Sequence, residues 1–266
     1  MSEQRAYRQV TLARVHQHSR AQAHDQVATE VPVALVYNCQ SHAVMMASPC
    51  HLLDFAYGFT LSEGIVESAS ELLHTAVLPQ SQGVTLAITI PEHRASRLHE
   101  RSRSLEGRSG CGLCGIQEMA QALRPLPTLP ETAGIPARAI AAALTALPAQ
   151  QLLNRDTGAL HAAAFADREG ALRIVREDIG RHNALDKLIG ATARAGINAS
   201  SGVVLVTSRC SMEMVQKTIA FGCPLLVAVS APTSLAIELA QAHNLTIAAF
   251  ARNERFNLYS HPQRVL

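Results

Sequence analysis

The sequence lacks tryptophan altogether, and aromatic residues make up only 4% of its 266 residues. Its six cysteines are too sparse for a disulfide framework in a chain of this length. The 23 basic and 21 acidic side chains give a net charge of +2, which excludes a general nucleic-acid coat. No apolar run reaches the ~18–20 residues that cross a bilayer, and residues 1–30 are too polar for a signal peptide. We therefore expect a cytoplasmic protein that binds neither nucleic acid nor membrane.

Hydrophobic residues are 48% of the chain, enough for a large core. A chain of this length buries roughly 70–75% of the surface that its unfolded form exposes, so the fold needs no cross-links. We predict four segments in order along the chain: a disordered tail over residues 1–26, a small α+β domain over 27–100, a mobile loop and proline-spaced linker over 101–136, and an α/β domain over 137–266.

The pattern of the α+β domain is a hairpin followed by a helix and a further strand. β-rich runs at residues 31–37 and 42–47 predict the hairpin. A helix with an apolar face should follow Ser48 and Pro49 and end at Gly64, and residues 83–90 read as another strand.

Regular alternation of strands and helices begins at His161. The runs at 161–166 and 172–176 flank a turn and predict a second hairpin. One antiparallel hairpin followed by strand–helix alternation indicates a three-layer α/β domain whose mixed sheet has a parallel portion. The further strands are predicted at 203–206, 225–229 and 245–250, and the helices at 182–194, 212–221 and 234–242.

The sharpest local feature is the pair Cys111 and Cys114, spaced CxxC in a glycine-rich loop. A nearby cation such as Arg108, and a helix N-terminus near Ile116, lower the pKa of a thiol and make it nucleophilic. This context favours catalytic sulfur chemistry. Half of a zinc site, a redox disulfide and an inert loop remain as alternatives, although the chain offers no second CxxC for zinc.

A second candidate site comes from polar segments that follow four predicted strands, at residues 177–183, 207–210, 230–234 and 251–255. In open α/β sheets ligands bind at the carboxyl ends of the strands, where helix N-termini hold anions. Four arginines in these segments add planar donors that suit phosphate, which predicts a pocket for a phosphorylated, nucleotide-like ligand. The alternative is ordinary helix capping beside solvated side chains. The arginines are Arg181, Arg209, Arg252 and Arg255.

Two further residues stand near these segments. His182 is either an acid–base group or a hydrogen-bonded structural residue beside a helix start. Lysine is nearly absent from the chain, and for Lys187, four residues after Asn183 on the same helix, a surface position is the expectation.

Five motifs together resemble the formate dehydrogenase accessory sulfurtransferase family, FdhD, over residues 27–264. They are SGCGLCG at 109–115, REDIGRHNALDKLIG at 176–190, TSRCSMEM at 207–214, VSAPTSLAIELA at 229–240 and the ending FARNERFNLYSHP.

The resemblance implies a cytoplasmic homodimer that acts as a sulfurtransferase. It implies that Cys111 accepts persulfide sulfur from a cysteine desulfurase, with Cys114 as the second cysteine of the pair. The sulfur would pass to the bis-molybdopterin guanine dinucleotide form of the molybdenum cofactor before that cofactor enters the formate dehydrogenase catalytic subunit, and a guanine nucleotide should mimic this acceptor.

Joining the resemblance to the strand-end pattern gives a set of expected cofactor-binding residues, with no metal ligands among them. The set is Arg181, His182, Asn183, Ser208, Arg209, Ser230, Phe250, Ala251, Arg252, Asn253, Glu254 and Arg255.

The family likeness also implies a cytidine-deaminase-like fold for the C-terminal half. Deaminase chemistry itself is not expected, because the chain lacks the HxE and PCxxC signature of zinc deaminases. Two other functions remain open: a cofactor-binding chaperone without sulfur chemistry, and a zinc-binding regulator.

Overall fold

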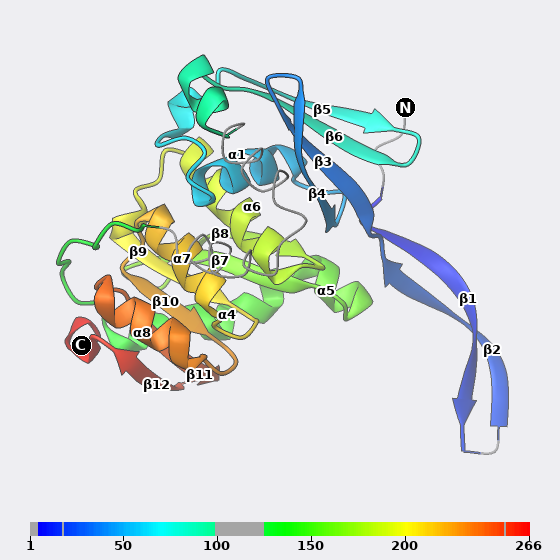
Figure 1. Cartoon of the computed structure of the whole chain (residues 1–266). Coiled ribbons are helices and arrows are strands. Elements are labelled where there is room, and N and C mark those ends of the chain that lie inside the picture. The colour runs from blue at the N-terminus through cyan, green and yellow to red at the C-terminus, as the bar shows by residue number, and fades with distance from the viewer. Residues whose placement is uncertain (1–4, 18, 99–124, 253) are drawn as a thin grey trace, which may run out of the picture.

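The computed structural model describes residues 5–17, 19–98, 125–252 and 254–266 (Figure 1). The described residues form a four-stranded sheet, a six-stranded sheet and a separate two-stranded hairpin, and helices lie between the two larger sheets and on the far side of the six-stranded one. The N-terminal sheet has the strand order β4-β3-β6-β5, in which β3 and β6 are parallel and the outer pairs are antiparallel. Its strands are β3 (Val31–Tyr37), β4 (Gln40–Ala47), β5 (His74–Gln80) and β6 (Gly83–Thr89).

One face of this sheet packs on helix α1 (Leu52–Ser62). Alternate residues of β3, from Val31 to Tyr37, are buried, which is the period of two expected when one strand face meets a core. Phe55 and Phe59 fill the space between helix and sheet with their rings in edge-to-face contact. A 3₁₀ turn, η1 (Ala69–Glu71), leads from this helix to β5, and residues 92–98 form a further helical stretch.

The C-terminal sheet has the order β12-β11-β10-β9-β7-β8. Strands β9, β10 and β11 are parallel, while β7 is antiparallel to both β8 and β9. The predicted mixed sheet with a parallel portion is therefore confirmed. Its strands are β7 (His161–Asp167), β8 (Leu172–Asp178), β9 (Gly202–Val206), β10 (Leu225–Ala228), β11 (Thr246–Arg252) and β12 (Arg255–Ser260).

Helices cover both faces of this sheet, as the three-layer prediction requires. Val204 and Val206 point into the core made with α6, α7 and α8, whereas Val203 and Leu205 point into the core made with α4. Among the described residues no helix is long and apolar enough to cross a membrane. The helices are α4 (Ala137–Gln150), α5 (Leu152–Thr157), α6 (Arg181–Arg194), α7 (Met212–Phe221) and α8 (Ser234–Ala242), with 3₁₀ turns η2 (Ala199–Ser201) and η3 (Pro262–Arg264).

Helices α1 and α6 join the two parts of the molecule through a close crossing (Figure 1). Glycines occupy the crossing on both helices, because a Cβ on Gly58 would lie 1.6 Å from the Asp186 carbonyl oxygen. A Cβ on Gly190 would lie 1.9 Å from the Asp54 carbonyl oxygen. Only glycine permits the two backbones to approach this closely.

The predicted disordered tail over residues 1–26 is wrong. Strands β1 (Tyr7–His16) and β2 (Ser19–Ala28) form an antiparallel hairpin in register over ten pairs, which projects from the body (Figure 1). The error arose because these strands are mostly polar and exposed, so the hydrophobic pattern that usually reveals a strand is weak here. Strands β5 and β12 were also missed. The likeness to a deaminase fold stays a prediction.

Candidate functional site

The two cysteines of the CxxC pair, Cys111 and Cys114, lie outside the described residues, as does Asn253. Described residues 125–136 run as irregular chain, apart from a bridge between Ile135 and Val265. The second candidate site, at the strand ends, lies almost wholly within the described part of the chain.

Four strands of the C-terminal sheet run in one direction. Strands β9, β10 and β11 are parallel, and β8 shares their direction because β7 is antiparallel to both β8 and β9. Their carboxyl ends, Asp178, Val206, Ala228 and Arg252, therefore share one edge of the sheet. Helices α6, α7 and α8 begin just beyond the first three of these ends.

Two of these helix N-termini have no side-chain cap. Gly180 precedes α6 and Ser211 precedes α7 without a capping hydrogen bond, while the Thr233 hydroxyl of α8 accepts one from the Ala236 N–H. The free N–H groups of the first turn and the helix dipole attract an anion. The sheet edge thus presents two uncapped helix N-termini near each other.

Arg181 and His182, the first residues of α6, each carry a buried nitrogen without a partner. Arg181 Nε and His182 Nε2 have no hydrogen-bond partner among the residues that the structure describes. A buried donor without a partner costs free energy, so such atoms point to a missing ligand, water or ion. Burial, together with the Arg181 guanidinium, lowers the pKa of His182, which keeps the imidazole neutral.

His161 and Glu213 belong to the same neighbourhood, and sequence reasoning missed both. Burial and the Arg181 charge lower the pKa of His161, which starts β7 at this sheet edge. The Ser211 side chain, together with the Arg181 guanidinium, lowers the pKa of Glu213. The cluster is therefore two neutral imidazoles around one guanidinium, with one carboxylate nearby.

The predicted residues of the next two strand ends lie along the same edge. Ser208 is buried and its hydroxyl donates to the Arg209 carbonyl oxygen at 3.0 Å, while the Arg209 side chain is exposed. The carbonyl of Ser230 accepts a hydrogen bond from the Phe250 N–H at 3.2 Å, which ties β10 to the end of β11.

We predicted that a strand ends at Phe250 and exits into residues 251–255. Instead β11 continues to Arg252, and Arg255 begins the antiparallel strand β12, so the chain bends back here into a paired strand. Phe250 has a left-handed φ of 52° and keeps 49% of its surface exposed although it is aromatic. Ala251 is buried beneath the sheet, whereas Arg252, Glu254 and Arg255 are exposed. The bend therefore offers one aromatic ring and two arginines to solvent.

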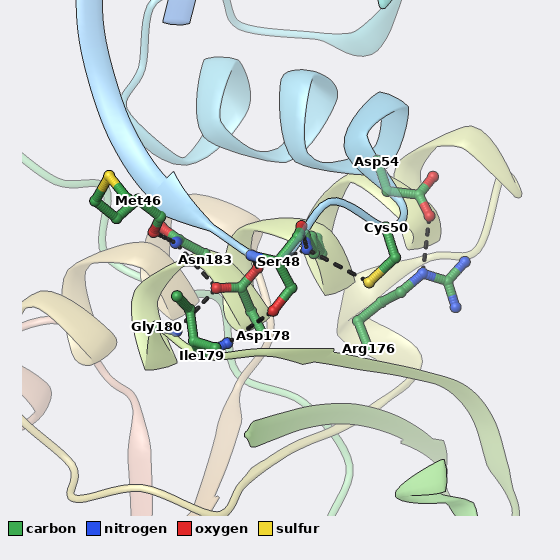
Figure 2. A network of polar contacts seen from close by, with 10 residues as sticks. Met46, Ser48, Cys50, Asp54, Arg176, Asp178, Ile179, Gly180 and Asn183 are labelled. Atoms are coloured by element: carbon green, nitrogen blue, oxygen red, sulfur yellow. Dashed lines mark hydrogen bonds and ion pairs between the residues drawn. The ribbon is translucent and has the colours of Figure 1, made fainter. Parts of the chain in front are cut away.

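Asn183, predicted to bind the cofactor, is buried and forms hydrogen bonds within the protein instead. Its side-chain amide donates to the Met46 carbonyl at 2.8 Å and to Asp178 Oδ1 at 3.1 Å (Figure 2). The residue is 2% exposed, so direct contact with a ligand would break these bonds. The structure places it in the contact between β4 and the start of α6.

The expectation that Lys187 lies at the surface is wrong, since the residue is 0% exposed. Its Nζ forms an ion pair with Asp178 Oδ2 at 2.5 Å and donates to the Ser48 carbonyl at 2.9 Å. The Cys50 sulfur lies 4.0 Å from the same nitrogen. Burial outweighs this cation and raises the pKa of Cys50, so its thiol stays protonated.

Asp178 accepts four hydrogen bonds and fixes the beginning of α6 (Figure 2). Besides Lys187 and Asn183, the backbone N–H groups of Ser48 and Gly180 donate to it at 3.0 and 2.8 Å. The Ser48 hydroxyl in turn accepts from the Ile179 N–H at 3.2 Å. One buried carboxylate thereby sets the position of the Arg181 and His182 backbone relative to the N-terminal sheet.

A second buried pair, Asp186 and Lys217, reinforces the α1–α6 crossing. Lys217 Nζ lies 2.9 Å from Asp186 Oδ1 and 2.6 Å from Glu63 Oε1, and it also meets the Ser62 hydroxyl. Burial lowers the pKa of Lys217, but the two carboxylates outweigh it and raise the pKa overall. Asp54 of α1 pairs with Arg176 and Arg194.

Both lysines of the chain are thus buried in ion pairs across this junction. The rarity of lysine was the one sequence signal that set these two residues apart, because lysines at a protein surface are usually numerous. Within the described ranges no group of three or more His, Cys, Asp or Glu residues could hold a metal ion.

Comparisons with known proteins match nearly the whole chain. The family model described as FdhD/NarQ family matches residues 28–266. A relative from Bordetella petrii, named sulfur carrier protein FdhD, is 50% identical over 241 residues, which are 91% of this chain and 87% of that protein. A relative of the same name from Xanthomonas axonopodis pv. citri is 51% identical over 257 residues, 96% of this chain and 92% of its own.

Solved structures include a protein of similar fold. It is described as a formate dehydrogenase accessory protein from Desulfotalea psychrophila, and it superposes with a TM-score of 0.78 at 23% identity. The match covers 98% of this chain and 100% of that one.

Proposed function

This chain belongs to the FdhD/NarQ family, and on that premise we propose that it carries sulfur in the maturation of formate dehydrogenase. The observation that carries the proposal is the near-full-length identity of about half to relatives named sulfur carrier proteins. Two uncapped helix N-termini and the unpartnered nitrogens of Arg181 and His182 support a phosphorylated acceptor.

In the first step, the Cys111 thiolate attacks the terminal sulfur of a persulfide on a cysteine desulfurase. A new S–S bond forms between Cys111 and that sulfur, and the donor's S–S bond breaks, leaving its electron pair on the desulfurase thiolate. The terminal sulfur then resides on Cys111 as a persulfide. The thiolate of Cys111 is the required nucleophile because a thiol attacks far more slowly.

In the second step, the sulfur leaves for an acceptor, proposed to be the molybdenum cofactor in its bis-molybdopterin guanine dinucleotide form. Attack of the Cys114 thiolate on the Cys111 sulfur expels the terminal sulfur as hydrosulfide to this substrate and forms a Cys111–Cys114 disulfide. A dithiol reductant restores both thiols. Cys114 therefore supplies the two electrons that the carried sulfur needs.

The guanine nucleotide groups of the acceptor are proposed to bind at the edge of the C-terminal sheet where its parallel strands end. Phosphate oxygens there would accept from the free N–H groups of α6 and α7 and from the unpartnered Arg181 Nε and His182 Nε2. The exposed ring of Phe250 would stack on a guanine base. Arg209, Arg252 and Arg255 are exposed along the same edge and add positive charge.

Sulfur loading tests the first step. The native chain, incubated with a cysteine desulfurase and cysteine, should gain the mass of one sulfur atom in non-reducing mass spectrometry, and Cys111→Ala should not. Cys39→Ala is the matched control, because Cys39 is an exposed cysteine in the turn between β3 and β4. Full loading of the Cys111 variant would reject the assignment.

Nucleotide binding tests the second step separately. GDP is the probe, and Arg181→Ala should weaken its binding by about tenfold or more, as loss of a charge-assisted hydrogen bond predicts. Arg173→Ala, which removes an exposed arginine from β8, should leave binding unchanged. A double Cys111→Ala, Cys114→Ala variant that still activates formate dehydrogenase would instead favour a cofactor chaperone without sulfur chemistry.

A further inference from the structure

Glu213 is the second residue of α7, at the sheet edge where the parallel strands end, and phosphate binding at that edge leaves it without a role. Lys217 Nζ and Asp186 Oδ1, 2.9 Å apart, join α7 to α6. Glu213 precedes this lysine by four residues, and His182 precedes this aspartate by four. Residues four apart share one face of a helix, so Glu213 and His182 face the same gap between the two helix N-termini.

The hydrogen-bonding groups around this gap are not matched to one another. Arg181 Nε and His182 Nε2 are buried and have no partner among the described residues. Glu213 is exposed, its lowered pKa keeps it ionised, and no ion pair within the described part of the chain includes it. An ionised carboxylate only accepts hydrogen bonds, and it repels a phosphate. The part of a ligand that meets Glu213 must therefore donate hydrogen bonds.

A divalent cation can also bridge a carboxylate and a phosphate, but this place does not suit one. Such an ion takes roughly six oxygen ligands. The described ranges hold no group of three or more His, Cys, Asp or Glu residues that could bind a metal. The Arg181 guanidinium would also repel the cation. A neutral group with N–H donors is the better match to Glu213.

We propose that Glu213 is a specificity-determining residue that binds the edge of a 2-amino-4-oxopyrimidine ring, where a ring N–H and an amino group point the same way. Its two carboxylate oxygens accept one hydrogen bond from each. Guanine and pterins have this edge, whereas hypoxanthine lacks the amino group and adenine has an unprotonated ring nitrogen there. The proposal rests on the proposed function, since the acceptor named there contains both guanine and pterin rings.

The backbone brings Glu213 to the same part of the edge as Phe250. The Cys210 N–H donates to the Ala231 carbonyl at 3.0 Å, and the Phe250 N–H donates to the Ser230 carbonyl at 3.2 Å. The loop after β10 therefore lies between the start of α7 and Phe250. Two strand spacings amount to about 10 Å, a span that a purine ring and a glutamate side chain cover together. A purine that stacks on Phe250 can thus direct its edge to Glu213.

Nucleotide affinity measured by calorimetry tests the proposal, with EDTA present so that no divalent cation takes part. The native chain should bind GDP at least about tenfold more tightly than ADP or IDP, which lacks the 2-amino group. Glu213→Gln should weaken GDP binding by at least about tenfold and IDP binding by less than about threefold, because glutamine offers a single acceptor oxygen. Glu238→Gln, which changes an exposed glutamate on α8, is the matched control and should alter neither affinity.

A second probe, 6-hydroxymethylpterin, distinguishes the two rings that share this edge. If the pterin half of the acceptor occupies Glu213, the substitution should weaken binding of this pterin instead of GDP. A Glu213→Gln variant that binds both probes as the native chain does, or that changes GDP and IDP affinity equally in either direction, would overturn the proposal and leave the phosphate site intact. A native chain that binds neither probe would overturn the acceptor site of the proposed function as well.

Discussion

Replacing Lys187 by methionine should leave the buried Asp178 carboxylate without its ion-pair partner. Lys187 and Asp178 side chains are both 0% exposed, and methionine nearly preserves the volume while removing the charge. Asp178 then keeps three N–H donors, from Ser48, Gly180 and Asn183, but no compensating charge. Breaking one partner of a buried pair costs about 3–5 kcal/mol of unfolding free energy, a large part of a typical total of about 5–15 kcal/mol.

Urea denaturation followed by circular dichroism measures this loss as a lower free energy of unfolding extrapolated to water.

The matched control is Arg173→Met, which breaks the ion pair with Asp167 where the arginine side chain is 59% exposed. That variant should lose only about 0–1 kcal/mol, because solvent screens surface pairs. A Lys187 variant that loses no more stability than the control would refute the role given to this ion pair.

The other predictions concern the helix crossing and the strand-end edge. Gly190→Ala places a Cβ 1.9 Å from the Asp54 carbonyl oxygen and should lower stability by about 1–3 kcal/mol or more, so an unchanged Tm in calorimetry would contradict the crossing. GDP should bind more tightly as the pH falls from about 8 toward about 6, because the lowered pKa of His182 rises beside an anion and binding then takes up a proton. Calorimetry in two buffers of different ionisation enthalpy detects that proton, and His182→Gln should abolish its uptake. Phe250→Ala should weaken GDP binding by about 1–3 kcal/mol if the base stacks on this ring, and equal affinity would exclude stacking there.

Local pattern was sufficient for most of the C-terminal sheet. The run Val203 to Val206 is β-branched or leucine throughout and buried on both faces, which is the mark of a central strand. Helix α7 ends at Gly222, whose left-handed φ of 82° makes it a C-cap that can be recognised from sequence. The shared strand direction that gathers Asp178, Val206, Ala228 and Arg252 followed from the same alternation of elements.

Contacts between residues far apart in the sequence could not be predicted from the local sequence pattern. Lys187 looked like a surface residue of a helix and Asn183 like a cofactor-binding residue, because their partners Ser48 and Met46 come 139 and 137 positions earlier. His161 was missed for the same reason, since only the fold brings it near Arg181. Strand β12 was missed because the polar residues around 253 resembled an exit loop rather than a bend between paired strands.

The bonds between Ser48 and Asp178 have a consequence for how the chain is made. The Ser48 N–H and the Asp178 carboxylate are 130 positions apart, and α1 rests on α6 through Gly58 and Gly190. During synthesis the N-terminal sheet and α1 emerge long before their supporting helix has been translated. The side of α1 that meets α6 carries Asp54, Gly58 and Ser62, and these residues lack their partners on α6 until Arg194 has left the ribosome. The N-terminal part of the chain therefore cannot complete its buried polar contacts until more than two thirds of the 266 residues have been synthesised.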